Sequence, residues 1–288
     1  MKRLIITLLA LGLIGAQAGS AVAQVLDGTL KKIKSTGVIR IGHRDSSAPF
    51  SFMSPEGKPV GYSIDLCERI ARAVQAELKL TSLKIQYVPV TVSNRMDLVA
   101  SGAVDIECGS STASLSRQER VDFSSLIFID GGAYLVGRGS GIQGITDFAG
   151  KKIGVIPGTT TEPAVQEDLQ RNGVTATIVP ITDHDKGFLA LQAGEIDAYA
   201  SDRTILVGLL VRENAADKFG VTDQQFSYEP YALMLRRNDS AFRLVVNRAL
   251  ARVYRSGDIV PIYSKWFAVM GRPSGALLLM YRLFALPE

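Results

Sequence analysis

The stretch Asp97-Leu-Val-Ala-Ser-Gly-Ala-Val-Asp105 has a counterpart in the second half of the chain, Leu189-Ala-Leu-Gln-Ala-Gly-Glu-Ile-Asp197. In each stretch a helical pattern stops at a glycine, and a short apolar run follows that ends in polar residues. Those polar residues are Gly109-Ser-Ser-Thr112 in the first half and Ser201-Asp202 in the second. The shared pattern predicts two similar lobes, although a match this short also arises by chance.

Alternating strand and helix patterns surround both stretches. In the first half, the expected strands cover residues 38–42, 84–90 and 104–108, and the expected helices cover 64–78 and 94–100. In the second half, the expected strands cover residues 152–156, 176–179 and 196–200, and the expected helices cover about 162–172 and 186–192. A hairpin is expected to turn at residues 54–57. Strands that alternate with helices predict an α/β fold built on parallel sheets.

The N-terminus has the layout of a secretory signal peptide. Lys2 and Arg3 precede an apolar run over residues 4–15, and small and polar residues lead to Ala21-Val-Ala23. This arrangement marks a segment that is removed during export. The run is short for a membrane span of about 20 residues, so cleavage after Ala23 (signal peptide 1–23) is favoured over a retained anchor. The expected mature chain starts at Gln24 and resides in the periplasm.

Length and charge narrow the class of protein. The chain has 288 residues, 47% of them hydrophobic, and a net charge of +4. This length suits two domains of modest size. The positive charges form no long run, so nucleic acid is not an expected partner, whereas a mild basic excess in a cleft favours an anionic ligand. The apolar tail over residues 276–286 is expected either to pack on the body or to be partly disordered.

Cysteine and histidine are scarce. Cys67 lies in a helical pattern and Cys108 at the end of an expected strand. An oxidising compartment permits a disulfide, but the sequence does not show that the two meet, so one bridge and two buried free thiols both stay open. Two histidines and two cysteines that are far apart in the sequence do not form the ligand pattern of a metal site. No metal, cofactor or catalytic residue is expected, and the chain is not expected to be an enzyme.

Polar residues follow the carboxyl ends of several expected strands, which is where open α/β sheets bind ligands. They are residues 43–47, 110–112 and 158–161, together with His184 and Asp202. Arg44 offers a planar set of donors for a carboxylate, and the threonines at 159–161 precede a helix whose N-terminus favours an anion. Asp202 suits an ammonium group. An amino acid carries both charges on one carbon and fits this set.

Four stretches also match a family pattern. They are Gly42-His-Arg-Asp-Ser-Ser-Ala-Pro-Phe-Ser51, Asn94-Arg95, Glu107-Cys-Gly-Ser-Ser-Thr112 with Arg117, and Gly158-Thr-Thr-Thr-Glu162. With them, the chain resembles the periplasmic amino-acid-binding proteins of ABC transporters, solute-binding protein family 3, over residues 30–267. The Gly-His-Arg and Glu-Cys-Gly-Ser segments resemble the glutamate/aspartate-binding branch in particular.

The resemblance implies an architecture and a role. Two lobes would be joined by two extended crossings at residues 131–136 and 228–235, with a ligand cleft between them. Lobe 1 would take residues 24–134 and 232–288, and lobe 2 residues 135–231. The expected protein is a monomer whose hinge closes around L-glutamate or L-aspartate. It would then deliver the ligand to an ABC transporter permease in the membrane.

The resemblance also implies contacts for the backbone end of the ligand. Arg117 would hold the α-carboxylate, with help from Thr112 and from Thr160 in the other lobe. Ser110 and Asp202 would receive the α-ammonium group. Simpler explanations stay open, because Asp202 also suits a helix N-cap and Arg117 also suits a surface ion pair with Glu119 or Asp122.

The side-chain carboxylate of the ligand would be surrounded by Arg44, Arg95 and His184. A neutral side chain would leave two guanidiniums without an anion in a closed cleft, which is costly, so acidic ligands are expected. The sequence departs from the branch at Val92, where the family carries a side-chain-binding serine. Ser93 lies one position off. The balance between glutamate and aspartate is therefore open.

Two other functions are weighed against transport. A dehydratase that acts on cyclic acids belongs to the same wider family, and it would need a general acid facing the ligand. His184 and Glu107 are the candidates for that role, whereas His43 is expected to point away from Arg44. A sensor that docks to a separate membrane receptor is the other alternative.

Overall fold

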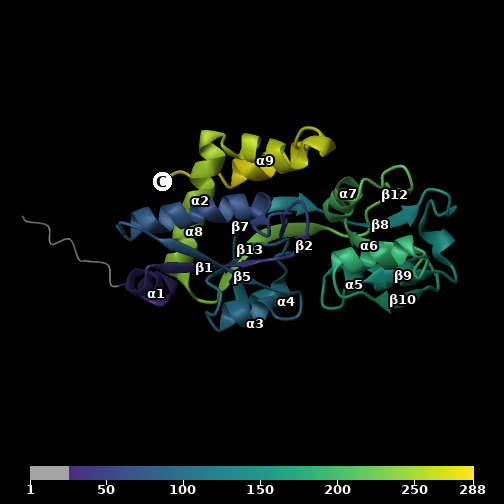
Figure 1. The fold of residues 1–288 in the computed structure, drawn as a ribbon, viewed down its shortest axis with the longest axis horizontal. Helices are drawn as coiled ribbons and strands as arrows, with labels where there is room; N and C mark the ends of the chain where they lie inside the picture. The colour runs from purple at the N-terminus through teal and green to yellow at the C-terminus, as the bar shows by residue number, and fades with distance from the viewer. Residues whose placement is uncertain (1–25) are drawn as a thin grey trace, which may run out of the picture.

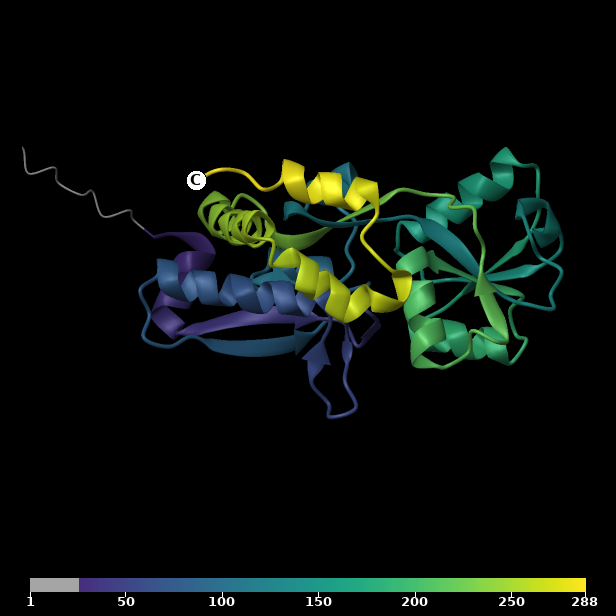
Figure 2. The same cartoon turned by 90° about the horizontal axis from the view of Figure 1, so that it is seen from above.

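The computed structural model describes residues 26–288, so the expected signal peptide lies outside the described residues. The chain forms two α/β lobes that lie side by side along the longest axis of the molecule, as both Figure 1 and Figure 2 show. Each lobe contains one five-stranded sheet. Among the described residues, no helix has the length and apolar character needed to cross a bilayer.

The sheet of the first lobe has the strand order β5-β1-β6-β13-β7. Its strands are β1 (Val38–His43), β5 (Lys84–Pro89), β6 (Ile106–Glu107), β7 (Val121–Asp130) and β13 (Glu229–Arg236). The helices of this lobe are α1 (Gly28–Thr36), α2 (Tyr62–Glu77), α3 (Arg95–Ala100), α4 (Leu115–Gln118), α8 (Ser240–Ser256), α9 (Ile259–Phe267) and α10 (Gly275–Leu283). A one-turn 3-10 segment at Ala268–Met270 precedes α10.

The sheet of the second lobe has the order β10-β9-β11-β8-β12. Its strands are β8 (Gly132–Gly137), β9 (Lys152–Val155), β10 (Thr177–Pro180), β11 (Ala198–Asp202) and β12 (Phe219–Val221). Its helices are α5 (Thr161–Arg171), α6 (His184–Gln192) and α7 (Arg203–Arg212), with a 3-10 turn at Ile145–Phe148. The two sheets share one plan, in which three neighbouring parallel strands are followed by an antiparallel one.

The predicted parallel arrangement is confirmed for three strands of each sheet, and the strands that cross between the lobes add antiparallel pairs. Strand β8 runs antiparallel to β11, and β13 runs antiparallel to β6. Strand β8 enters the second lobe directly from β7, and β13 returns to the first lobe. A strand that arrives from the opposite lobe enters at the carboxyl ends of the parallel strands, so it must run against them. The division of the chain at residues 134 and 232 stays a prediction.

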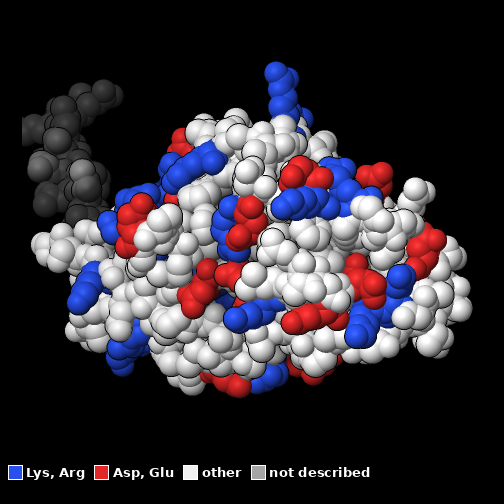
Figure 3. All heavy atoms as spheres, turned by 45° about the vertical axis from the view of Figure 1, so that its right-hand side comes forward, with Lys and Arg blue, Asp and Glu red and all other residues white. Residues whose placement is uncertain are grey.

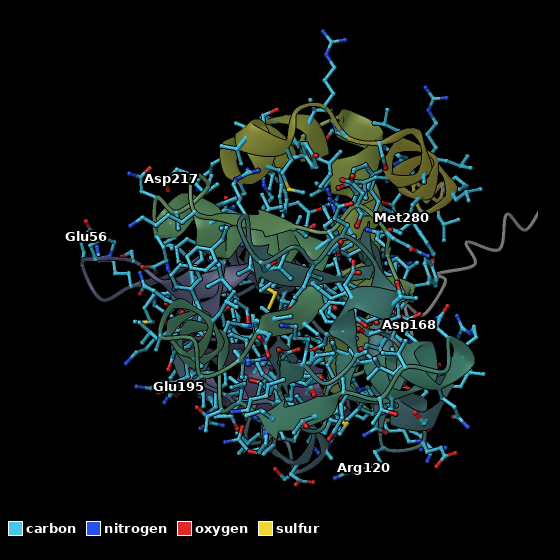
Figure 4. The ribbon with its side chains drawn as sticks, turned by 90° about the vertical axis from the view of Figure 1, so that its right-hand side faces the viewer. Glu56, Arg120, Asp168, Glu195, Asp217 and Met280 are labelled. Carbon is cyan, nitrogen blue, oxygen red and sulfur yellow. A yellow bond between two sulfur atoms is a disulfide. The ribbon has the colours of Figure 1, made fainter. Side chains whose placement is uncertain are left out.

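This topology fixes where a ligand site can form. The carboxyl ends of β1 and β6 in one lobe, and of β9 and β11 in the other, point to the region that the crossing strands traverse. The loops that follow these strands therefore meet between the lobes. A hairpin of β3 (Ser51–Met53) and β4 (Pro59–Val60), joined by β2 (Ser46–Ser47), confirms the expected turn. Its tip at Glu56 stands away from the body in Figure 4.

An aromatic cluster forms the centre of the first lobe's core next to this region. The Phe50 ring lies 5.0 Å from both Phe128 and Tyr231 between centroids, and Phe128 stacks on Phe267 at 4.9 Å. Aromatic pairs at these separations contribute about 0.5–1.5 kcal/mol each beyond area burial. The cluster holds Tyr231 rigidly, and this residue reaches the site described below.

The apolar C-terminal tail packs on the first lobe rather than remaining free. Helix α10 buries Leu277, Met280 and Tyr281, and Figure 2 shows the C-terminal helices lying along the first lobe. The Tyr281 hydroxyl lies 2.9 Å from that of Tyr62, which donates to the backbone carbonyl of Ile127. Of the two expectations for this tail, the packed one is correct.

Cys67 and Cys108 form a disulfide, which decides the question that the sequence left open. It joins α2 to the residue after β6 and is visible as the yellow bond inside the molecule in Figure 4. Cys108 directly follows Glu107 and precedes the loop that carries Ser110. The bridge thus anchors one wall of the space between the lobes to the core.

We expect the paired substitution Cys67→Ser and Cys108→Ser to lower the free energy of unfolding by about 2–4 kcal/mol, because the bridge closes a loop with a sequence separation of 41 residues. Urea unfolding with and without reductant checks this. The variant should show the same midpoint in both conditions, whereas reductant should lower the midpoint of the natural chain. An unchanged midpoint in the natural chain would contradict the prediction.

Candidate functional site

Polar side chains from both lobes line one cavity between them, with about 330 Å³ of empty space including the part open to solvent. All eight residues predicted to bind ligand lie on its wall. The first lobe contributes Arg44, Arg95, Ser110, Thr112 and Arg117, and the second contributes Thr160, His184 and Asp202. Val92, Thr159, Thr161 and Ser201 complete the lining. The structure thus brings together five separate strand ends, as the sequence pattern predicted.

Arg117 is held at the boundary of the lobes by backbone contacts. Ser114 caps helix α4 by accepting a hydrogen bond from the backbone N–H of Arg117. The guanidinium donates through Nη1 to the carbonyl of Thr112 at 3.0 Å and through Nη2 to Gly158 in the other lobe at 3.4 Å. Asp122 pairs instead with Arg243, so the surface ion pair considered from sequence does not form with that residue.

The charge of Arg117 is poorly solvated. Burial, followed by repulsion from Arg95, lowers the pKa of Arg117 to about 10. The nearby carboxylates of Glu229 and Asp202 partly offset this effect. A buried cation whose remaining donors face a cavity is a strong binder for a carboxylate, because the bound anion restores the solvation that burial removed.

Arg44 and Arg95 form a second cationic region. Arg44 follows β1, is 5% exposed, and donates its backbone N–H to Ser51 Oγ at 2.9 Å. Arg95 opens helix α3, is 3% exposed, and donates through Nη1 to Ser111 Oγ at 2.8 Å. Its buried Nε has no hydrogen-bond partner. Burial, then repulsion from Arg95, lowers the pKa of Arg44 to about 10.

His184 faces these arginines from the other lobe and is neutral. Its Nδ1 lies 2.8 Å from the Tyr199 hydroxyl. Gly187 makes this possible, because a Cβ there would lie 2.4 Å from the Tyr199 ring. Burial, followed by the charges of Arg44 and Arg212, lowers the pKa of His184 to about 3. An uncharged imidazole in this position can exchange a hydrogen bond but adds no charge.

Carboxylates gather near Arg117. Asp202 ends strand β11 and accepts a hydrogen bond from the Tyr231 hydroxyl through Oδ2, while Oδ1 is buried without a partner. Burial, followed by repulsion from Glu229 and Asp130, raises the pKa of Asp202 well above its usual range. Asp202 begins α7 without a side-chain cap bond, so the N-cap explanation does not account for it.

Glu229 is a site residue that the sequence did not reveal. Its Oε2 accepts from Thr112 Oγ1 at 2.5 Å and from Thr160 Oγ1 at 2.7 Å, so it joins the two lobes through one carboxylate oxygen. Ser227 donates to its Oε1 at 2.7 Å. Glu229 lies in a segment interpreted only as a crossing, and its partners are far away in sequence. No local signal could have found it.

The remaining candidates take the positions expected from alternation. Val92 is buried and lines the cavity, whereas Ser93 is exposed and pairs with Thr91 Oγ1 at 2.9 Å. Ser93 therefore does not replace the family's missing hydroxyl. His43 packs edge-on against Tyr87 and is not part of the cavity wall. On the face shown in Figure 3, basic and acidic side chains are interspersed, whereas three of the four charged residues on the cavity lining are arginines.

Comparison with known proteins agrees with this geometry. The model of the bacterial extracellular solute-binding proteins, family 3, matches residues 39–269. An L-glutamate/L-aspartate-binding protein of Pseudomonas aeruginosa is 40% identical over 255 residues, 88% of this chain and 84% of that protein. A glutamate/aspartate import solute-binding protein of Salmonella typhimurium is 34% identical over 259 residues, 90% and 85% of the two chains.

A solved structure supports the fold. The ancestral amino acid-binding protein AncCDT-1, described as a precursor of cyclohexadienyl dehydratase, superposes with a TM-score of 0.72 at 28% sequence identity, covering 83% of this chain and all of that one (100%). The family model matches most of the chain, and two relatives are more than 30% identical to it, so the family can be assigned. The chain belongs to the bacterial extracellular solute-binding proteins, family 3.

Proposed function

We propose that this protein is a periplasmic receptor that closes its two lobes around L-glutamate or L-aspartate. The observation that carries the proposal is the convergence of three arginines and one aspartate on one cavity. Arg44, Arg95 and Arg117 converge on it from separate chain segments, and Asp202 is the one acidic residue among the lining residues, suited to pair with an ammonium group. A dicarboxylic amino acid presents the complementary set of charges.

The backbone end of the ligand fits the boundary between the lobes. In the proposed pose, the α-carboxylate accepts from Arg117. The hydroxyls of Thr112 and Thr160, which lie 3.3 Å apart across the boundary and donate to Glu229 Oε2 without ligand, turn to donate to the α-carboxylate as well. The α-ammonium group donates to Asp202 and Ser110. Because these donors and acceptors belong to different lobes, only a closed arrangement satisfies them together, and the ligand stabilises that arrangement.

The side-chain carboxylate of the ligand then lies between Arg44, Arg95 and His184. The low dielectric of a buried site makes positive charge without a counterion costly, so a carboxylate is favoured over an amide or an apolar group. The relatives named for glutamate and aspartate support this assignment. We propose that the loaded, monomeric receptor delivers its ligand to the permease of an ABC transporter.

Catalysis is the weaker second candidate. A dehydratase needs a group that exchanges a proton near neutral pH, and the pKa of His184, lowered to about 3 by burial and nearby arginines, makes it a poor acid or base there. Mass spectrometry of the protein incubated with L-glutamate, L-aspartate and a cyclic dicarboxylic acid distinguishes the two functions. Recovery of unchanged ligand supports a receptor, and a dehydrated product supports an enzyme.

Isothermal titration calorimetry against the twenty common amino acids tests the proposal. We expect glutamate and aspartate to bind, glutamine and asparagine to bind more weakly, and amino acids with basic side chains not to bind. Equal affinity for acidic and neutral ligands would overturn the assignment.

Binding is also expected to release protons over the pH range in which Asp202 titrates. The raised pKa of Asp202 means that its buried carboxyl holds a proton for part of the time without ligand. An ammonium group favours the ionised form and expels that proton, so affinity should rise with pH while Asp202 titrates. Calorimetry at one pH in two buffers with different ionisation enthalpies measures the release. The Asp202→Asn variant should release fewer protons, and equal release in both proteins would contradict this role.

A further inference from the structure

Glu107 carries a buried charge that has no role in the proposed binding mode. It ends β6, where its backbone pairs with Gly42 of β1 on one side and Met234 of β13 on the other. Its exposure is 0%, and it does not line the cavity. An ionised carboxylate in such a place costs several kcal/mol unless cations compensate it. A purely packing role would be served better by an apolar residue.

One of the compensating cations is Arg95. Ser111 Oγ accepts from Arg95 Nη1 at 2.8 Å and donates to Glu107 Oε2 at 2.7 Å. Ser111 is itself fully buried, so this relay is shielded from water. The hydroxyl can serve both partners only if the carboxylate accepts, which is the arrangement expected for an ionised Glu107 beside a cation.

The other cation is Arg44, and a glycine brings it close. A Cβ at Gly109 would lie 2.2 Å from Glu107 Oε1 and 3.0 Å from Arg44 Cγ. Both side chains therefore pass over the same point of the backbone. Glu107 Oε1 is buried and has no hydrogen-bond partner, so its charge acts on the arginines through space. The opposing effect of Glu107 on the pKa of Arg44 has the same origin.

These contacts define the charge of the region that would receive the ligand's side chain. Arg44 and Arg95 each contribute one positive charge, Glu107 contributes one negative charge, and His184 is neutral. The net charge is one positive unit, which a single carboxylate neutralises. A doubly charged group would leave one negative unit unbalanced in a closed cavity, where the cost is large.

We propose that Glu107 is a specificity-determining residue that acts from behind the cavity, setting the side-chain region to accept one negative charge and to reject two. Glu107 does not touch the ligand in this role. It positions Arg95 through Ser111 and halves the charge that Arg44 and Arg95 present. The inference rests on the proposed function, because it concerns the same side-chain region.

The test compares L-glutamate with L-phosphoserine in the natural chain and in the Glu107→Gln variant. The two ligands have the same backbone end and the same number of atoms between Cα and the acidic head. At about pH 8 the phosphate carries nearly two charges, because its second pKa is about 6. Glutamine keeps an oxygen that accepts from Ser111 but removes the negative charge.

We expect Glu107→Gln to shift the ratio of the two dissociation constants by about tenfold or more toward phosphoserine, and to widen the preference for glutamate over glutamine. Two controls separate charge from structure. Ser111→Ala breaks the relay without changing the charge and should weaken both ligands while leaving their ratio within about threefold. Asp105→Asn removes another buried carboxylate, which binds Lys32 and the backbone N–H of Arg40, and should lower stability without changing the ratio.

A measurement on the natural chain keeps the inference testable if the variant does not fold. Between about pH 8 and about pH 5 phosphoserine loses one charge, so its affinity relative to glutamate should rise. The titration of Asp202 affects both ligands equally, so its effect cancels in the ratio of the two dissociation constants. A ratio that stays constant with pH, or that Glu107→Gln leaves unchanged while glutamate still binds, overturns the inference alone. Failure of the natural chain to bind glutamate or aspartate overturns the proposed function instead.

Discussion

The substitution Arg117→Ala is expected to abolish detectable binding of every amino acid. In the proposed pose, Arg117 is the buried donor to the α-carboxylate, which all amino acids share. It also reaches Gly158 in the other lobe. Removal of one partner from a buried, charge-assisted pair costs about 3–5 kcal/mol, and each 1.4 kcal/mol is about tenfold in affinity. A loss of at least about a hundredfold should therefore appear for acidic and amide ligands alike.

Stability should not follow affinity in this variant. The pKa of Arg117 is lowered by burial and by Arg95, so its charge destabilises the ligand-free protein. We expect the thermal midpoint without ligand to stay constant or rise. Arg120→Ala is the matched control, since Arg120 lies on the exterior in Figure 4 and forms an exposed ion pair with Asp97. Calorimetry and thermal unfolding on both variants check this, and binding retained by Arg117→Ala would contradict the proposed pose.

The sequence predicted the parts of the site that have a local signature. Arg44, Ser110 and Thr160 follow strands and Asp202 ends one. The end of a strand can be found from a run of apolar residues stopped by polar ones. The repeated helix-to-strand pattern at residues 97–105 and 189–197 placed two such ends correctly. Side chains at the carboxyl ends of neighbouring parallel strands must meet, whatever the rest of the fold does.

What the sequence did not predict depends on contacts between distant residues. Glu229 meets Thr112 and Thr160 only because β13 returns between the lobes. The antiparallel direction of β8 and β13 follows from the lobe each strand comes from, which no local pattern records. The disulfide likewise required α2 and β6 to lie side by side. Helix α7 was not predicted because it is apolar on nearly all sides, so its sequence lacks the spacing of an amphipathic helix.

The loss of Arg44 is expected to change which ligand binds rather than whether one binds. In the Arg44→Ala variant, glutamate and aspartate should lose about 3–5 kcal/mol, because a buried carboxylate loses a charged partner. Glutamine should lose only about 1 kcal/mol, the contribution of an ordinary hydrogen bond. Arg44→Met, which keeps much of the apolar stem, should give the same pattern, because the loss arises from the charge.

The charge of the side-chain region explains why the loss of Arg44 should shift the preference from acidic ligands toward amides. Without Arg44, the positive charge of Arg95 is balanced by Glu107 through Ser111. The region then carries no net charge and suits a neutral amide. Calorimetry with glutamate, aspartate, glutamine and asparagine measures the ratios, and Arg40→Ala is the control because Arg40 lies on the same strand but not on the cavity wall. Equal losses of affinity for acids and amides would show that Arg44 does not select the ligand. The buried pair of guanidiniums would then give no reason to expect discrimination between an acid and its amide.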